Sequence, residues 1–223
     1  MKKEDIKINI EKYCSKIDNQ SRWASFDYCY NYFYENRGQQ LVDDIEKSCS
    51  VLGFYLASWG MFRGKSYLSQ NSLAIYKPVI EYISDLDNSV WEIDVDNYNE
   101  KSIDEIINIY KKIKIKIGIK KTHLTLVTKI LLGVFGFIPA FDTNFCNGFR
   151  EIHKEKKQCG FTRVNKKSLL LIKDFYDSNN ELIIDLQNKL FTTDFITGEK
   201  TSIKYTKAKI IDMYGFELGK KLN

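Results

Sequence analysis

Apolar residues recur every three or four positions along most of the 223-residue chain, which is the spacing of amphipathic α-helices. The clearest stretch follows Ser102, where isoleucines keep this spacing until Gly118. Ser102 with Glu105 three residues later is typical of a capping box at a helix start. The same spacing predicts helices over the ranges 6–17, 21–37, 41–61, 66–84, 102–117, 124–136, 143–157, 165–190 and 206–218, the 165–190 stretch being one helix or two.

Two of these predicted helices contain a signal that opposes them. Pro78 interrupts the 66–84 pattern, and because proline disfavours helical geometry in the residue before it, we expect a break or kink near Lys77. The stretch 112–120 (KIKIKIGIK) has isoleucine at every second position, with lysine or Gly118 between, so a strand competes with the helix there. Continuity with the helical pattern upstream favours the helix.

Two further segments lie outside the helical pattern. The acidic stretch 88–98 predicts a loop or a short strand, and 191–205, which is rich in β-forming residues, predicts a β-hairpin. With 12 Gly and 2 Pro, the chain has too few turn residues for an all-β fold. We therefore expect an all-α, single globular domain of about ten helices. A two-lobed arrangement with a boundary near 88–100 is the alternative.

The cysteines and the apolar runs bear on cofactors and location. The five cysteines are widely spaced, with no CxxC pair and no Cys/His cluster, so we expect free thiols and neither a metal nor a cofactor. Free thiols are typical of the reducing cytoplasm, and the charged N-terminus lacks the apolar core of a signal peptide. The uncharged runs 51–62 and 130–141 are too short to cross about 30 Å of hydrocarbon. The sequence thus predicts a cytoplasmic protein with no membrane partner.

Positive charge is concentrated in one part of the chain, although the net charge is only +5. Residues 110–173 contain 15 Lys and Arg against three acidic residues, and the rest of the chain is net acidic. A basic block of this density can bind double-stranded DNA by neutralising phosphates and releasing counterions. The alternative is a solvated, lysine-rich surface. The block surrounds the turn 136–143, which favours DNA binding.

The sequence around this turn is similar to a known family. The stretch 117–122 (IGIKKT), a following helix and the stretch 139–145 (PAFDTNF) together resemble the core of the helix-hairpin-helix DNA glycosylases. The resemblance implies that family's multi-helix fold. It also implies a hairpin glycine at Gly118, which binds the DNA backbone, and a catalytic aspartate at Asp142.

Two lysines of the same stretch have counterparts in the family. Lys121, or its neighbour Lys120, lies near the nucleophilic lysine of the lyase-active members. Lys120 stands where the family has a second hairpin glycine, and Lys121 is a few residues further from Asp142 than in the family. The stretch 58–64 (SWGMFRG), beside the Asp142 segment, also resembles an uncharacterised bacterial family, which implies no activity.

Asp142 suits base excision on physical grounds as well. Loss of a base builds positive charge on the sugar, which a nearby carboxylate can stabilise while it activates water. The N-terminus of a helix favours the ionised form of that carboxylate. An extruded base needs an aromatic or apolar pocket, for which Trp59, Phe141 and Phe145 are candidates. An ordinary helix cap at Asp142 and core positions for the two phenylalanines are the alternatives.

A second candidate site lies at the end of the 41–61 helix. Trp59 and Arg63 are four residues apart and therefore share one side of the helix. The guanidinium of Arg63 could bind a phosphate or carboxylate next to Trp59, or it could cap carbonyls near Gly64. Gly53 and Gly60 belong to a stripe of small residues that permits close approach of another helix or of a ligand.

These observations lead to three functional hypotheses. The first is a nucleic-acid-binding protein that excises modified or damaged bases as a DNA N-glycosylase, with Asp142 as general base. The second is a non-catalytic helical module that binds DNA or protein. The third is a helical protein that binds a small anionic ligand near Trp59 and Arg63. For DNA binding the candidate residues are Gly118, Lys120, Lys129, Arg150 and Lys154.

Overall fold

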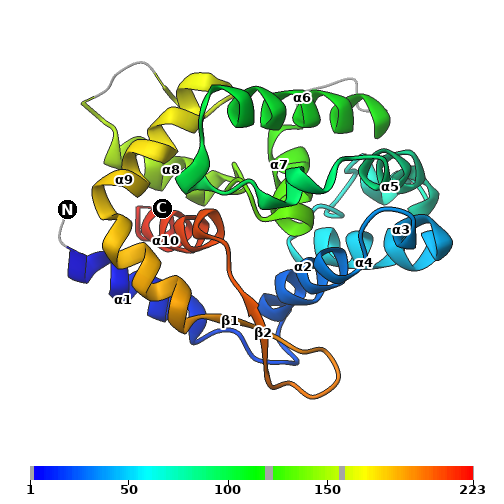
Figure 1. The fold of residues 1–223 in the computed structure, drawn as a ribbon, viewed down its shortest axis with the longest axis horizontal. Coiled ribbons are helices and arrows are strands. Elements are labelled where there is room, and N and C mark those ends of the chain that lie inside the picture. The colour runs from blue at the N-terminus through cyan, green and yellow to red at the C-terminus, as the bar shows by residue number, and fades with distance from the viewer. Residues whose placement is uncertain (1–2, 119–122, 156–158, 223) are drawn as a thin grey trace.

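A computed structural model describes residues 3–118, 123–155 and 159–222. These residues form ten α-helices, five short 3-10 helices and one two-stranded antiparallel sheet (Figure 1). The expected helical fold and the β-hairpin are thereby confirmed. The elements are α1 (Lys3–Cys14), α2 (Ser25–Glu35), α3 (Gln40–Asp43), α4 (Ile45–Ser58), α5 (Lys77–Ser84), α6 (Glu100–Lys116), α7 (Leu124–Phe135), α8 (Thr143–Ile152), α9 (Lys166–Lys189), β1 (Phe191–Thr193), β2 (Lys200–Lys204) and α10 (Lys207–Lys221).

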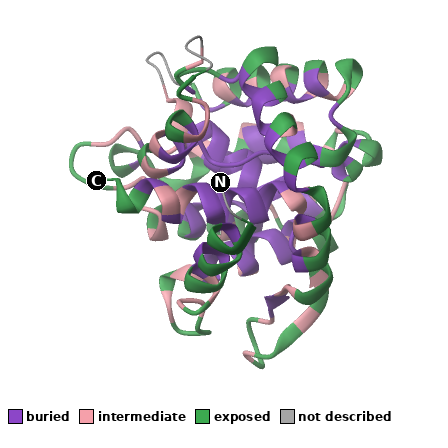
Figure 2. Ribbon diagram, turned by 90° about the vertical axis from the view of Figure 1, so that its left-hand side faces the viewer, coloured by how far each residue is buried: buried purple, intermediate pink, exposed green. Residues whose placement is uncertain are grey.

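Helices α7 and α10 supply much of the buried core. Every residue of α7 from Leu126 to Phe135 is buried, and α10 is buried over most of its length. A helix that is apolar on all sides has to be surrounded by other elements. Figure 2 shows the buried residues gathered in the central helices, with exposed residues at the periphery. No α-helix within the described ranges combines the length and the apolar character needed to span a membrane.

Helices α8 and α10 meet backbone to backbone. A Cβ atom on Gly148 would lie 2.4 Å from the carbonyl oxygen of Gly215, and one on Gly219 would lie 1.7 Å from the carbonyl oxygen of Asn144. No side chain fits at either glycine without moving the backbone. The first turn of α8 is therefore positioned by α10.

The predicted 41–61 helix is interrupted in the structure. Asp44 separates α3 from α4, and its carboxylate accepts a hydrogen bond from the backbone of Lys47 at 3.2 Å. An aspartate side chain competes with helical hydrogen bonding, and apolar spacing does not reveal this effect. The prediction of one continuous helix was wrong at this position.

The predicted 66–84 helix is broken, as expected from Pro78. The proline lies in the first turn of α5, where its missing N–H costs no helical hydrogen bond. The part upstream of Lys77 is not α-helical, because it forms two 3-10 helices, Leu68–Gln70 and Leu73–Tyr76.

The boundaries of several other helices differ from the prediction by a turn or so, as in α1, which spans Lys3–Cys14 instead of 6–17. Helix α6 is capped by Asn99, and Ser102 is the third residue of the capping box instead of the cap itself. Because α6 remains helical to Lys116, the described residues exclude the competing strand. Helix α8 begins after Asp142 as predicted but ends at Ile152 rather than near 157.

The acidic stretch 88–98 is neither a loop nor a strand. It forms two 3-10 helices, Asn88–Glu92 and Val95–Asn97, each capped by an aspartate side chain. Val90 and Val95 are buried within these helices. Both valines therefore join the core from a short, tight turn.

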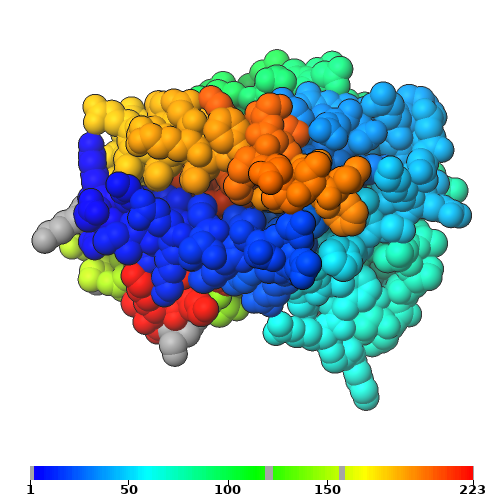
Figure 3. Space-filling model, turned by 90° about the horizontal axis from the view of Figure 1, so that it is seen from below, coloured from blue at the N-terminus to red at the C-terminus, as the bar shows by residue number. Residues whose placement is uncertain are grey.

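The β-hairpin lies along the N-terminal segment of the chain (Figure 3). The ring of Phe195 packs edge-on against that of Tyr28 at 4.9 Å between centroids. The buried carboxylate of Asp27 accepts hydrogen bonds from the hydroxyl of Tyr205 at 2.8 Å and from the backbone of Thr193 at 2.9 Å. Burial raises the pKa of Asp27 to about 6.

Candidate functional site

The turn between α7 and α8 is fixed from the side of α10. Gly136 ends α7 in a left-handed conformation (φ +71°), and its carbonyl accepts a hydrogen bond from the hydroxyl of Thr206 at 2.6 Å. The backbone N–H of Ala140 donates to Oδ1 of Asp212 at 3.0 Å. The turn that precedes Asp142 is thus held at both ends by residues of the α10 region.

Helix α7 holds the end of the same turn. The hydroxyl of Thr128 accepts from the backbone N–H of Phe141 at 2.9 Å, and the hydroxyl of Thr125 donates to its carbonyl at 3.0 Å. One turn after Thr125, the ammonium of Lys129 donates to Asp142. Consecutive residues of the turn therefore bind consecutive positions on one face of α7.

Asp142 caps α8 and forms an ion pair with Lys129. Its Oδ1 accepts a hydrogen bond from the backbone N–H of Phe145 at 3.0 Å, and its Oδ2 lies 3.0 Å from Nζ of Lys129. The Asp142 side chain is 15% exposed and that of Lys129 is 5% exposed. The helix N-terminus and the cation both attract negative charge to this position.

Aromatic rings surround the same ion pair. The ammonium of Lys129 lies 4.8 Å from the ring centroid of Trp59, which ends α4. Trp23 meets Trp59 edge-on at 5.3 Å, and the exposed guanidinium of Arg22 lies over both rings, at 5.3 Å from Trp23 and 5.6 Å from Trp59. The predicted proximity of Trp59 to Asp142 is therefore mediated by Lys129.

A second lysine–aspartate pair lies deeper beside this group. Nζ of Lys209 is 2.8 Å from Oδ2 of Asp212 and donates to the hydroxyl of Tyr13 at 2.9 Å. It also lies 6.0 Å from the ring of Trp59. Sequence reasoning missed this pair, although a lysine and an aspartate three residues apart on a mostly apolar helix are a usable signal.

A cavity of about 380 Å³ adjoins the start of α7. Gly60, Met61 and residues 66–68 form one wall, and residues 123–126 form the other; we call it the α7 cavity. The rings of Tyr67 and His123 are 6.2 Å apart. Partial burial and the nearby Lys114 lower the pKa of His123, which favours its neutral imidazole. The sequence offered no pattern that singled out either residue.

Phe141 and Phe145 lie in the aromatic core. Both are buried, and their rings stack at 5.6 Å. Phe145 also stacks on Phe149 at 4.3 Å, and Phe161 packs edge-on against it. Neither phenylalanine lines the α7 cavity. They support the first turn of α8 from within.

The expectation that Trp59 and Arg63 share one side of a helix was wrong, because α4 ends at Ser58 and both residues follow it. Arg63 is exposed and folds back over the turn after α4. A Cβ atom on Gly60 would lie 2.7 Å from its Nε, so the guanidinium stem covers that glycine. Trp59 and Arg63 thus flank Gly60, which lines the α7 cavity. An anionic ligand near this pair remains a prediction.

Apart from Lys129, the candidate DNA-binding residues that the structure describes lie at the end of α6 and at the end of α8. Gly118 follows α6 in a left-handed conformation (φ +73°), while Lys120 and Lys121 lie outside the described residues. On α8, Arg150 donates to the carbonyl of Gly160 at 2.7 Å.

Lys154, just after α8, is exposed and pairs with Glu151 at 2.9 Å. Part of the basic block is balanced by acidic residues elsewhere, since Lys166 pairs with Glu100 at 2.7 Å. Exposed cations of the block include Lys111, Lys112, Lys116, Arg150 and Lys154.

The cysteines and acidic residues give no sign of a metal site in the part of the chain that the structure describes. No group of three or more His, Cys, Asp or Glu side chains is arranged there to hold an ion. All five cysteines are free. Burial raises the pKa of Cys14 to about 11 and that of Cys146 to about 12, so both thiols stay protonated.

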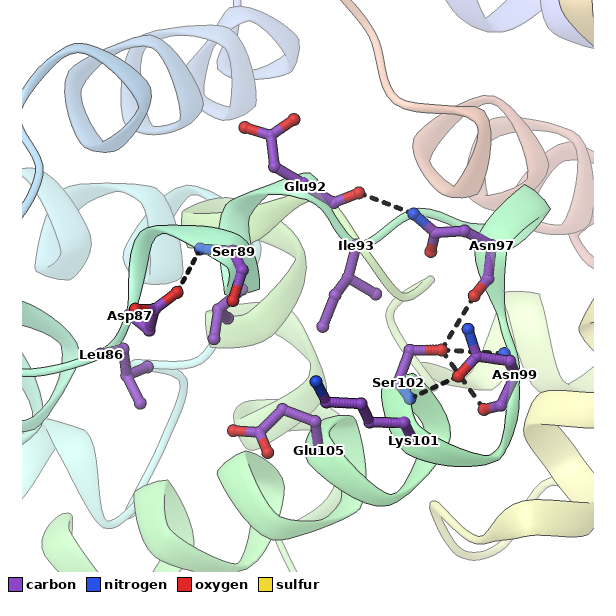
Figure 4. Close-up of a pocket in the computed structure, with 11 residues that line it drawn as sticks. Leu86, Asp87, Ser89, Glu92, Ile93, Asn97, Asn99, Lys101, Ser102 and Glu105 are labelled. Atoms are coloured by element: carbon purple, nitrogen blue, oxygen red, sulfur yellow. Dashed lines mark hydrogen bonds between the residues drawn. The ribbon is translucent and has the colours of Figure 1, made fainter.

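A different cavity, of about 360 Å³, lies between α6 and the 3-10 helices before it (Figure 4). Asp87, Glu92 and Glu105 line it, with Lys101 as the cation among its lining residues. Its net negative charge disfavours phosphate groups, and it contains none of the candidate residues. The α7 cavity, in contrast, is lined by Thr125, whose hydroxyl binds the carbonyl of Phe141 next to Asp142.

No protein-family model, no curated protein and no solved structure matches this chain.

Proposed function

We propose that the protein binds double-stranded DNA and excises a modified or damaged base, as a DNA N-glycosylase of the helix-hairpin-helix type. The observation that carries the proposal is the position of Asp142. Its carboxylate sits at the N-terminus of α8, partly exposed, and pairs with Lys129, whose ammonium lies over the ring of Trp59. We place the protein in the cytoplasm, in keeping with its five free cysteines.

Asp142 has the chemistry that this reaction needs. When the bond between base and sugar breaks, positive charge develops on the sugar, and a fixed carboxylate stabilises it. The same carboxylate accepts a proton from the attacking water. Lys129 and the amide of Phe145 hold the carboxylate in place, so that little reorganisation is needed during the reaction.

The buried position of Lys129 changes its proposed role. At 5% exposure and in contact with both Asp142 and Trp59, it positions the carboxylate instead of binding a DNA phosphate. Gly118, Lys120, Arg150 and Lys154 remain the proposed backbone contacts. Lys121 remains a proposed nucleophile for a lyase step, which borohydride trapping on DNA would detect.

The experiment measures base release from a panel of duplexes that carry modified bases. We expect release by the wild type and its loss in Asp142→Asn, with DNA binding kept. Asparagine is as good a helix cap as aspartate, but it leaves the shielded ammonium of Lys129 without its ion-pair partner, so release is compared only after circular dichroism shows that the variant is folded. Asp177→Asn, at an exposed aspartate of α9, is the matched control and keeps full release. Release that persists in Asp142→Asn contradicts the proposal.

A non-catalytic DNA-binding module is the second candidate. The observation in its favour is that both carboxylate oxygens of Asp142 already have partners, as a cap tied by an ion pair requires. This candidate predicts salt-sensitive duplex binding without release of any base. The same panel of duplexes therefore decides between the two.

A further inference from the structure

The α7 cavity and the Asp142 site are built from neighbouring residues of the same segments. Gly60 and Met61, which line the cavity, directly follow Trp59 in the chain. The ring of Trp59 contacts Lys129, the partner of Asp142. Gly60 in the cavity wall is therefore bonded directly to Trp59, whose ring contacts the cation that pairs with Asp142.

The opposite wall belongs to α7 and leads to the same place. Thr125 lines the cavity, and its hydroxyl binds the carbonyl of Phe141 at 3.0 Å. Lys129 lies one turn further along the same face and binds the next residue, Asp142. One helical turn advances about 5.4 Å. The Asp142 site therefore lies about one turn along α7 from the cavity wall.

The chemistry of the cavity lining suits a planar heteroaromatic ring. Tyr67 and His123 offer two rings, and Met61 and Leu124 add apolar surface. The hydroxyl of Tyr67 donates to the carbonyl of Ile117 at 3.2 Å, which fixes its ring in place.

Polar groups in the same lining can bind the edge of such a ring. The hydroxyl of Ser66 and the neutral imidazole of His123 each offer donor and acceptor capacity. The volume of about 380 Å³ falls within the range of about 300–1,000 Å³ that is typical of ligand pockets.

We propose that the α7 cavity receives the extruded nucleobase, which contacts Tyr67 and His123 while the attached sugar lies beside Asp142. This inference rests on the proposed function, since it names the pocket and the substrate class of the same site. Base extrusion has an energetic cost, and stacking on a fixed ring offsets part of it. The stretch 58–64, whose role the sequence left open, thereby contributes a wall of the base pocket.

The test is an NMR titration of the ¹⁵N-labelled protein with each of the four deoxynucleosides, and with 2-deoxyribose as the control that lacks a base. We expect at least one deoxynucleoside, but not the sugar, to shift amide signals of residues 60–68 and 123–126. Ser66→Trp fills the cavity and weakens this binding by about tenfold or more, the effect of losing one stacking contact. Ser72→Trp adds the same side chain at an exposed cap outside the cavity and leaves binding unchanged.

If circular dichroism shows that Ser66→Trp does not fold, a second variant takes its place in the test. His123→Ala removes a ring instead of adding one, and it should weaken the binding in the same direction. The inference is overturned if no deoxynucleoside shifts these signals, or if the shifts persist in both cavity variants.

Failure of this inference can be told apart from failure of the proposed function. If the wild type binds deoxynucleosides in the α7 cavity but releases no base from any duplex, the glycosylase proposal fails and the pocket stands. If Asp142→Asn abolishes base release while Ser66→Trp and His123→Ala release bases as the wild type does, the activity stands and the pocket is wrong.

Discussion

The ammonium group of Lys129 lies 3.0 Å from Oδ2 of Asp142, and both side chains are largely shielded from water. The ion pair joins the second turn of α7 to Asp142, the residue immediately before α8. Because the Lys129 ammonium also contacts the ring of Trp59, one cation connects three separate segments of the chain. The carboxylate of Asp142 is consequently held by tertiary structure as well as by its own helix.

Removal of this cation should destabilise the fold. Lys129→Met keeps most of the side-chain volume but leaves a shielded carboxylate without its partner, so we expect the free energy of unfolding to fall by about 3 kcal/mol. Urea unfolding followed by circular dichroism measures this change. Lys189→Met breaks an exposed pair with Asp185 and should change the free energy by less than about 1 kcal/mol. Equal losses in the two variants would contradict a special role for the Lys129 pair.

The buried carboxylate of Asp27 should make stability depend on pH. Its pKa is about 6 in the folded protein against an ordinary value of 3.8. Between these values the folded state keeps a proton that the unfolded state has lost, so stability from this group falls as pH rises from about 4 to about 6. The wild type should therefore lose about 2 kcal/mol relative to Asp27→Asn between pH 4 and pH 7.

Urea unfolding of both proteins at intervals from pH 4 to pH 7 measures this difference. Asp104→Asn, on an exposed position of α6, serves as the control and should follow the wild type at every pH. A constant difference between wild type and Asp27→Asn would show that this carboxyl group does not titrate in the window.

The helix starts were predictable because the signals that fix them are local. Asp142, Asn165 and Thr206 each accept a hydrogen bond from a backbone amide three residues later. The break at Asp44 follows the same rule but falls inside a continuous apolar pattern. Such a cap can be recognised only if the tendency of an aspartate side chain to start a helix is compared with the apolar spacing around it.

The candidate site was predictable in part. Asp142 and Trp59 have signals in their own segments, a helix cap and a short motif. Lys129 was assigned to DNA because its partner lies across the turn, and only the docking of α7 against that turn reveals the pair. Tyr67 and His123 come together from segments far apart in the chain, so no local pattern could have joined them.

The glycine contact between α8 and α10 gives a third prediction. A methyl group on Gly148 would meet the carbonyl of Gly215 at 2.4 Å, so Gly148→Ala forces the two helices apart. We expect a loss of about 3 kcal/mol in the free energy of unfolding, the upper range for overpacking. Gly160→Ala meets only ordinary contacts and should change stability by less than about 1 kcal/mol, which thermal or urea unfolding would check.

The salt dependence of DNA binding tests the surface that α8 presents. The logarithm of the DNA association constant falls linearly with the logarithm of the salt concentration. If Arg150 and Lys154 each neutralise one phosphate, each alanine substitution makes this slope less steep by about 1. Lys189→Ala, at an exposed lysine of α9 outside the basic block, is the matched control and should leave the slope unchanged. Fluorescence anisotropy with a labelled duplex at several salt concentrations measures these slopes. Because Arg150 also binds the carbonyl of Gly160, Lys154→Ala is the cleaner variant, and an unchanged slope in it would remove this end of α8 from the proposed DNA interface.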